Sequence, residues 1–209
     1  NINGAGNINI LSGASMDLQN GSVSGTGALN NNLGGVVTPT SGTVAIDRTF
    51  NNNGTFNWAS GTVNGSGIFN NNNIFNIHTL FGGSLNLPLI NNGTINKTSS
   101  PQNLFLNSFQ NPGTVNVTSG NITLAINSGS ITLGGIINVS SGGTFQLGNN
   151  SSANFTVNAS ISGAGNFTGY SSSVNFSTSC IYNISGNTIA TGGTMNFNPG
   201  MTLTNIGNL

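Results

Sequence analysis

The residue types that carry most enzyme chemistry are almost absent from this chain. Its charged side chains are Asp17, Asp47, Arg48 and Lys97, which amount to 2% of 209 residues and give a net charge of zero. General acid–base catalysis and sugar hydrolysis need carboxylates or bases that lie close together. Asp17 and Asp47 are separated by about one and a half of the repeat units described below. Asp47 and Arg48 fit a charge pair in a loop, so we expect no catalytic residue and predict that the protein is not an enzyme.

Metal and cofactor sites are not predicted either. His78 is the single histidine and has no second His, Cys or acid at ligand spacing. Cys180 is the single cysteine, so no disulfide can form within the chain, and we expect it to be a small buried residue. The Gly-x-Gly stretches are not followed by helical patterns, which disfavours phosphate binding. We therefore expect no metal ion and no cofactor.

The charge balance also limits the partners. Binding of nucleic acid or anionic lipid needs clustered Lys and Arg, which this chain lacks. No apolar run approaches the roughly 18 residues of a membrane-spanning helix. We expect neither nucleic-acid binding nor direct membrane insertion.

A short pattern recurs along the whole chain, with an apolar residue, a polar residue and usually a second apolar residue. It is written GTFNWA at 54–59, GTINKT at 93–98 and GTVNVT at 113–118. The gaps between successive units are about 18 to 22 residues, the range of solenoid coils. The first apolar residues of the series are Met16, Val37, Phe56, Phe75, Ile95, Val115, Ile137, Phe155, Val174 and Met195. A looser marker with the same spacing is INGAG at 2–6, VSGTG at 23–27, VNGSG at 63–67 and ISGAG at 161–165.

The alternation within each unit predicts strands and not helices. It has a period of two, and helix-forming residues are scarce, with no Glu in the chain. The 12 Phe residues, regularly placed, argue against disorder. Residues 1–209 are therefore predicted to form one continuous, all-β, single-stranded parallel β-solenoid, or β-helix. We expect about ten coils of about 20 residues, with right-handed winding because parallel crossovers favour that hand.

This architecture explains the repeated asparagine. Alternate side chains of a strand point to opposite faces, so the apolar pair points inward and the Asn points outward. Like residues stack about 4.8 Å apart in a parallel sheet, and side-chain amides at that spacing can hydrogen-bond along the stack. We predict an outward ladder formed by Asn57, Asn76, Asn96, Asn116, Asn138, Asn175 and Asn196.

The repeated N-G-T-φ-N-φ units, in which φ is an apolar residue, resemble the right-handed β-helix stems of bacterial surface adhesins. Filamentous haemagglutinin-like and autotransporter passenger proteins are the families concerned. The resemblance covers essentially the whole chain and implies secretion, an extended rod at the cell surface, and a role in attachment or scaffolding. The expected function is that of a non-catalytic extracellular structural protein, either a surface rod or adhesin stem or a filament subunit.

A ligand-binding solenoid is the alternative function, with either ice or a surface glycan as ligand. Ranks of Thr on a solenoid face can order water, but T-x-T occurs here only at 38–40 and 202–204. Aromatic residues could stack on sugars, although burial is the commoner role of such residues. The aromatic candidates for ligand contact are Trp58, Phe81, Phe109 and Tyr170.

Glycosylation sequons are frequent. In each, the Asn and the Ser or Thr flank one residue, so both would face solvent from the same strand. Polar alternation in an Asn-rich chain also produces such triplets without any glycan. The candidate acceptors are Asn96, Asn116, Asn138, Asn154, Asn166, Asn175 and Asn183.

The ends of the sequence show no recognisable cap. The chain starts within a repeat unit, and TLTNIGNL at 202–209 reads as a further coil. Solenoids otherwise cover their terminal coils. We expect the chain to be a fragment or subunit of a longer rod or fibre, whose partners are flanking coils or further copies stacked head to tail.

Overall fold

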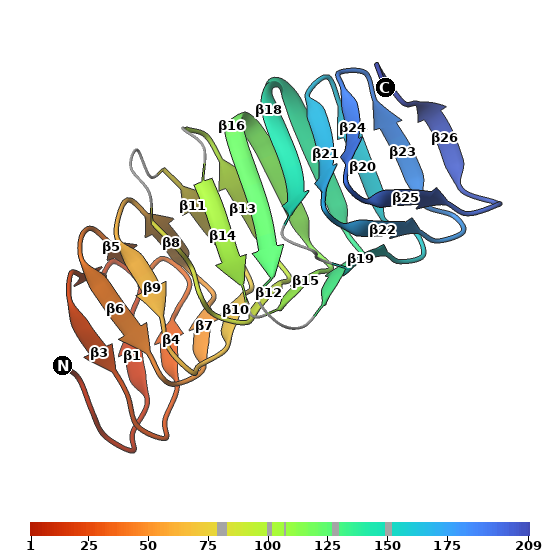
Figure 1. The fold of residues 1–209 in the computed structure, drawn as a ribbon. Helices are drawn as coiled ribbons and strands as arrows, with labels where there is room; N and C mark the ends of the chain where they lie inside the picture. The colour runs from red at the N-terminus through yellow and green to blue at the C-terminus, as the bar shows by residue number, and fades with distance from the viewer. Residues whose placement is uncertain (79–82, 100–101, 107, 127–129, 149–151) are drawn as a thin grey trace.

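The computed structural model describes residues 1–78, 83–99, 102–106, 108–126, 130–148 and 152–209. These residues form strands joined by short corners, and none of them forms a helix that could cross a membrane. The strands wind into an elongated parallel β-solenoid with the two termini at opposite ends (Figure 1). The predicted all-β parallel solenoid is thus confirmed, and about eight full turns come close to the expected ten. The right-handed winding stays a prediction.

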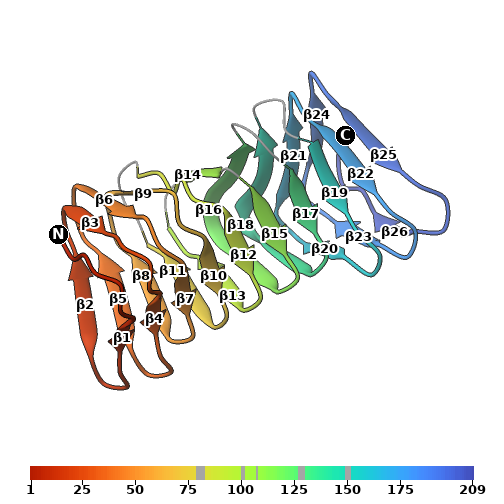
Figure 2. The same cartoon turned by 90° about the horizontal axis from the view of Figure 1, so that it is seen from below.

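Two long sheets, which we call face 1 and face 2, run the length of the molecule. Every described pairing within them is parallel, and Figure 2 shows the strands side by side. Face 1 contains β1 (Ile8–Ile10), β4 (Leu29–Asn31), β7 (Phe50–Asn52), β10 (Phe69–Asn71), β12 (Leu89–Asn91), β15 (Phe109–Asn111), β17 (Ile131–Leu133), β19 (Ser152–Phe155), β22 (Ser173–Phe176) and β25 (Thr194–Phe197). Face 2 contains β2 (Ser15–Leu18), β5 (Val36–Pro39), β8 (Thr55–Trp58), β11 (Ile74–Ile77), β13 (Thr94–Lys97), β16 (Thr114–Ile126), β18 (Ile136–Gly148), β20 (Ser160–Gly163), β23 (Ile181–Ile184) and β26 (Thr202–Asn205).

The third side of the coil, face 3, is built differently in the two halves. Near the N-terminus it is a separate three-stranded sheet of β3 (Gly21–Val23), β6 (Thr43–Ile46) and β9 (Thr62–Asn64). Further along, β16 and β18 turn out of face 2, and their second halves pair with β14 (Gln102–Leu106) and β21 (Asn166–Tyr170), which is followed by β24 (Thr188–Thr191). The register shift between Val117 and Ser119 marks the point where β16 turns.

The core follows from the alternation that the sequence predicts. In β8, Phe56 and Trp58 are fully buried, while Thr55 and Asn57 between and beside them remain partly exposed. Aromatic rings from successive coils stack along the axis, with Phe50 and Phe69 centroids 4.7 Å apart. Each coil buries its apolar side chains against the coils on either side of it, so the stack and not the single coil is the stable unit.

The corner between face 1 and face 2 exists in two lengths. It has four residues in the first two coils, at 11–14 and 32–35. It shortens to two residues in the middle coils, for example Asn53 and Gly54 between β7 and β8. The four-residue form returns in the last three coils, at 156–159, 177–180 and 198–201.

Two details of the predicted repeat are wrong. Phe155, Val174 and Met195 were expected to continue the column that starts at Met16, but they lie in face 1. The column on face 2 continues instead from Ile137 to Ile161. The Gly-x-Gly marker also denotes two different corners, because 24–28 join face 3 to face 1, whereas 164–165 join face 2 to face 3. Both errors arise because the coil length varies and the strands of all faces share one alternation.

Candidate functional site

The predicted outward asparagine ladder lies on face 2. Each amide nitrogen donates to the amide oxygen of the preceding coil, with Nδ2–Oδ1 distances of 2.9 Å to 3.0 Å. The ladder consists of Asn57, Asn76, Asn96, Asn116 and Asn138. These side chains are partly or fully exposed, so their amides form a polar, uncharged column at the surface.

Asn175 and Asn196 do not belong to this column, which corrects the prediction. They form a second ladder on face 1 with Asn154, with amide hydrogen bonds of 3.1 Å and 2.7 Å. Face 1 carries a similar ladder near the N-terminus, formed by Asn9, Asn30, Asn51 and Asn70. The molecule therefore presents amide ladders on two outer faces.

A further ladder is buried, and the sequence reasoning missed it. Its members lie at the face 1 end of the corner, and each is at most 1% exposed. Each Nδ2 donates to the next Oδ1 over 2.6 Å to 2.8 Å, in the direction opposite to the outer ladders. The buried ladder consists of Asn31, Asn52, Asn71, Asn91 and Asn111. The N-N pairs at 30–31, 51–52 and 70–71 could have revealed its first three members, since the second Asn of each pair occupies an inward position of the strand.

Beside the outer ladder of face 2 runs a column of β-branched side chains. Strand register places one such residue two positions before each ladder Asn, on the same outer face. In six successive coils these are Val36, Thr55, Ile74, Thr94, Thr114 and Ile136. Face 2 is thus a regular two-column array of methyl, hydroxyl and amide groups.

The charged and titratable groups lie apart, each in its own local hydrogen bonds. Asp17 accepts from Thr40 Oγ1 over 2.6 Å and from Gln19 Nε2 over 3.1 Å, and these bonds lower the pKa of its carboxyl. His78 Nδ1 lies 2.9 Å from Thr98 Oγ1. Among the residues that the structure describes, no three His, Cys, Asp or Glu side chains cluster as metal ligands would.

The expected loop charge pair between Asp47 and Arg48 is wrong. Asp47 Oδ1 accepts from the backbone N–H of Ser66 over 3.0 Å. Arg48 is 4% exposed, and its guanidinium donates to the backbone carbonyls of Gly4, Gly6 and Ser24. Arg48 therefore holds the first coils together and has no free face for a ligand.

Two buried groups are perturbed by their surroundings. Lys97 occupies an inward position of β13, is 0% exposed and donates to the backbone carbonyl of Ser99; burial lowers its pKa to about 8. Cys180 is also buried, as expected, and its Sγ lies 2.9 Å from the carbonyl oxygen of Thr156. Burial raises the pKa of this thiol, which makes it a poor nucleophile.

The aromatic candidates for ligand contact differ in their exposure to solvent. Trp58 and Phe109 are 0% and 1% exposed, so neither can contact a ligand at the surface, and Trp58 Nε1 donates to the Gly61 carbonyl over 3.1 Å. Tyr170 is 49% exposed at the end of β21. Phe81 lies outside the described residues.

The sequon asparagines are all on the outside, but most of them already donate their amide hydrogen. The Nδ2 atoms of Asn96, Asn116, Asn138, Asn166 and Asn175 donate to neighbouring coils. Asn154 and Asn183 are exposed, and their Nδ2 atoms make no such bond within the described part of the chain. A glycan on either of these two would break no rung of a ladder.

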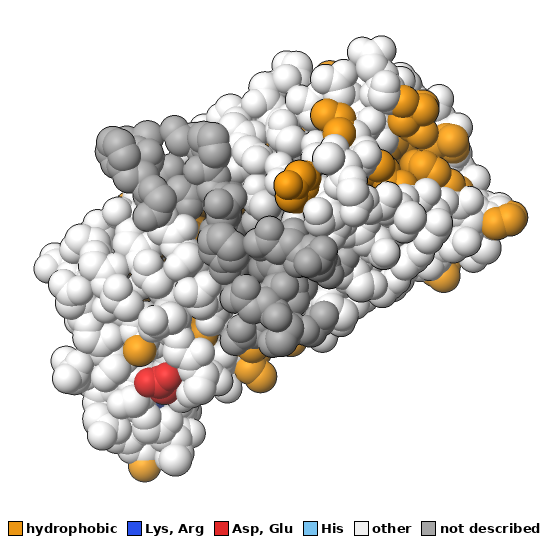
Figure 3. All heavy atoms as spheres, viewed as in Figure 1, with side chains coloured by type: hydrophobic (Ala, Val, Ile, Leu, Met, Phe, Trp, Pro, Cys, Tyr) orange, Lys and Arg blue, Asp and Glu red, His pale blue; other side chains and the backbone are white. Residues whose placement is uncertain are grey.

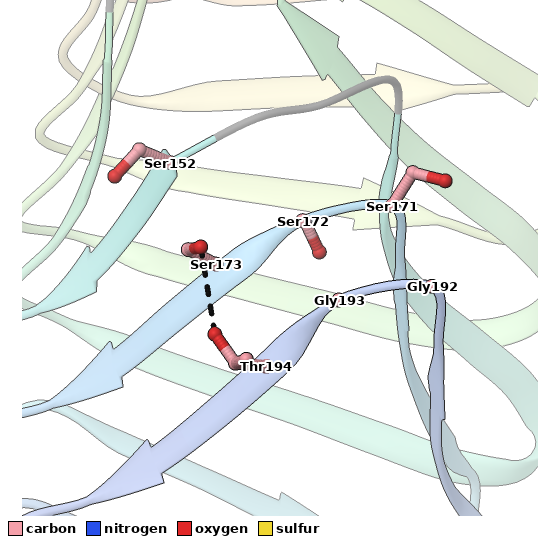
Figure 4. Close-up of a pocket in the computed structure, with 7 residues that line it drawn as sticks. All are labelled: Ser152, Ser171, Ser172, Ser173, Gly192, Gly193 and Thr194. Atoms are coloured by element: carbon pink, nitrogen blue, oxygen red, sulfur yellow. Dashed lines mark hydrogen bonds between the residues drawn. The ribbon is translucent and has the colours of Figure 1, made fainter.

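A shallow open hollow of about 340 Å³ lies where face 3 turns into face 1 near the C-terminus (Figure 4). Its lining is neutral and consists of Ser152, Ser171, Ser172, Ser173, Gly192, Gly193 and Thr194. The Ser172 hydroxyl is buried without a hydrogen-bond partner, but it would lie 3.2 Å from a Cβ placed on buried Gly169. It therefore faces the core and not the hollow.

These features define a parallel β-solenoid with few charged residues, no net charge and amide ladders on its outer faces. No protein-family model, curated protein or solved structure matches the chain.

Proposed function

We propose that this protein is a non-catalytic structural rod of the cell exterior, such as a surface rod or adhesin stem. The observation that carries the proposal is the continuity of faces 1 and 2, each of which stacks ten strands from one end of the molecule to the other. Such a stack resists bending because every coil is hydrogen-bonded to its neighbours along both faces.

The surface chemistry supports the same function. A column of charges about 4.8 Å apart would repel itself, whereas amides in the same column attract one another. The outer ladders therefore keep the rod polar while adding bonds along its axis. The scattered placement of the acids, the histidine and the arginine also supports a role without catalysis.

Two measurements test the proposal: the shape of the protein in solution and its location in the cell. Small-angle scattering should give a rod of constant cross-section, roughly 45–50 Å long for ten strands at about 4.8 Å each. Protease treatment of intact source cells should remove the protein, while a cytoplasmic marker survives. A globular scattering profile, or protection from protease in intact cells but not in lysed cells, would overturn the proposal.

Face 2 supports a second candidate, the binding of a ligand with a repeating surface, either ice or a polysaccharide. The supporting observation is the two-column array of β-branched and asparagine side chains over successive coils. Thermal hysteresis and pull-down with insoluble polysaccharides test it. Thr94→Lys/Thr114→Lys should abolish binding, whereas Asn51→Lys/Asn70→Lys on face 1 should not. Equal loss in both variants, or no binding by the parent chain, would rule out face 2 as the binding surface.

A further inference from the structure

The corner between face 1 and face 2 has the same local sequence in two coils of the solenoid. Residues 52–55 and residues 91–94 both read Asn-Asn-Gly-Thr, and in both coils the corner consists of the second Asn and the Gly. Asn53 and Asn92, at the first corner position, are both exposed. Any difference in reactivity between them in the folded chain therefore comes from their surroundings. The other Asn-Gly pairs of the chain lie outside this corner, at 3–4, 20–21 and 64–65.

An Asn followed by Gly can react with its own backbone, because glycine has no side chain to obstruct the nitrogen that follows the Asn. This nitrogen loses its proton and attacks Cγ of the Asn, so that an N–Cγ bond forms within one molecule. The Cγ–Nδ2 bond breaks, and the side-chain nitrogen takes up the proton and leaves as ammonia. Water then opens the cyclic imide at either carbonyl. The product is aspartate or isoaspartate, with one new carboxylate.

The next coil places two amide donors on the carbonyl groups of Asn53. Asn72 Nδ2 donates to the side-chain oxygen of Asn53 over 3.0 Å, and Asn73 Nδ2 donates to its backbone oxygen over 3.2 Å. The first bond stabilises the negative charge that develops on the side-chain oxygen during the attack, as an oxyanion hole does. The second bond polarises the peptide between Asn53 and Gly54, which makes the Gly54 nitrogen easier to deprotonate. Both bonds favour cyclisation.

The attacking nitrogen of Gly54 is available for the reaction. Its N–H donates to no acceptor among the residues that the structure describes. The N–H groups on either side of it both donate to the preceding coil, at the carbonyls of Asn31 and Gly35, over 2.8 Å and 2.9 Å. The attack therefore costs no hydrogen bond of its own, while the flanking bonds hold the corner in place.

The corner at Asn92 has the opposite hydrogen bonds. The Gly93 N–H donates to the Asn71 carbonyl over 2.9 Å, so the attacking nitrogen is engaged. Asn92 Nδ2 donates to Asn72 Oδ1 over 2.9 Å, which holds the leaving group in place. The next coil contributes residues 112–113 to this corner, and these read Pro-Gly and have no side-chain donor. Nothing there activates the carbonyl groups of Asn92.

We propose that Asn53 is a site of spontaneous chemical modification, at which the folded chain converts asparagine to aspartate and isoaspartate, and that the same sequence at Asn92 is protected by the fold. The proposal goes beyond the rod function and does not depend on it. Each conversion adds one negative charge to a chain whose net charge is zero, and charged side chains occupy little of the face shown in Figure 3. The converted fraction therefore increases with the age of the folded protein.

The first experiment compares the two sites within one molecule. The intact chain is incubated at mildly alkaline pH over several weeks, and fragmentation mass spectrometry of its peptides measures the converted fraction at Asn53 and at Asn92. We expect conversion to be about tenfold or more faster at Asn53, because even one well-placed donor to a developing oxyanion has an effect of this size. In urea-unfolded chain the two rates should be similar. Equal rates in the folded chain, a faster rate at Asn92, or a difference that persists in urea would overturn the proposal.

The second experiment removes the donor from the next coil. Asn72→Ala, at an exposed position, should slow the conversion of Asn53 about threefold or more, since the charge on its side-chain oxygen then lacks a fixed partner. Asn70→Ala is the matched control, because it removes an amide donor of the same coil that bonds to Asn51 over 2.9 Å and not to Asn53. Circular dichroism checks that both variants keep their β-structure. An unchanged rate in Asn72→Ala, or equal slowing in both variants, would contradict activation by Asn72.

Discussion

Lys97 is a charged residue at an inward position, where the alternation of the strand predicts an apolar one. It occupies an inward position between Ile77 and Val117 in the neighbouring coils, where every other described coil places a side chain that carries no charge. A protonated amine loses hydration there, which lowers its pKa from 10.5 to about 8. At neutral pH the folded chain therefore holds a charge that its surroundings disfavour.

Replacing this charge should stabilise the protein. We expect Lys97→Met to raise the free energy of unfolding by about 1 kcal/mol or more at pH 7, since methionine fills a similar volume without a desolvation cost. Thermal melting at pH 7 measures the effect. Thr98→Met, at the exposed residue that directly follows the same strand, is the control and should change Tm little. A lower Tm for Lys97→Met would mean that the bond to the Ser99 carbonyl outweighs the cost of burial.

The pH dependence of this effect has a definite sign. Between pH 8 and pH 10.5 the unfolded chain keeps the lysine proton and the folded chain loses it. The unfolded state then binds more protons, so the stability of the parent chain should rise with pH in this window, and that of Lys97→Met should not. Tyr182, whose pKa burial raises to about 12, acts in the opposite direction above pH 10, so the comparison is best made between pH 8 and 9.5.

Substitution of a residue in the buried ladder should have a large effect on the stability of the protein. Asn71 accepts from Asn52 over 2.7 Å and donates to Asn91 over 2.7 Å, and all three side chains are 0% exposed. Asn71→Ala would leave buried amide groups unpaired on both sides, at a cost of about 2–4 kcal/mol. Asn76→Ala in the outer ladder should cost less than about 1 kcal/mol, because water replaces its partners. Equal losses of Tm in the two variants would contradict the distinction between the ladders.

At the scale of elements, the alternation of apolar and polar residues was enough to predict the strands and which side chains of each strand point inward. Strands, inward apolar pairs and the ladder from Asn57 to Asn138 follow from a period of two combined with a coil of about 20 residues. The assignment of strands to faces does not, because Asn138 and Asn175 stand in the same local pattern but on different faces. Only the lengths of the corners decide the face, and these change from four residues to two and back. The buried ladder was missed because asparagine is rarely fully buried unless partners satisfy its amide.

The glycines of the Gly-x-Gly corners allow successive coils to pack closely, and this can be tested by substitution. A Cβ on Gly67 would lie 2.1 Å from the backbone oxygen of Arg48 in the preceding coil, so the coils can approach there only without a side chain. We expect Gly67→Ala to destabilise the protein by about 1–3 kcal/mol. Gly6 holds the same place in the first coil, and a Cβ there would meet nothing within 4 Å. Gly6→Ala should therefore leave Tm of the monomer nearly unchanged, and similar losses in both would refute the argument from close approach.

The whole molecule is a stack of coils, and the local stability of each coil depends on its position along the axis. The middle coils bury Phe50, Phe56, Phe69 and Phe75 completely, in contact with one another across successive coils. At the C-terminal end, the side chains of β26 are exposed throughout. Since each coil is stabilised by its neighbours on two sides, a terminal coil has about half of the contacts of a central one.

Hydrogen exchange should therefore follow the axis. In dilute solution we expect slowest exchange in β7, β8 and β10 and fastest exchange in β25 and β26, because terminal coils open without disturbing the rest. Uniform exchange along the chain would instead mean that the solenoid opens as a single cooperative unit, in which the end coils are as stable as the centre.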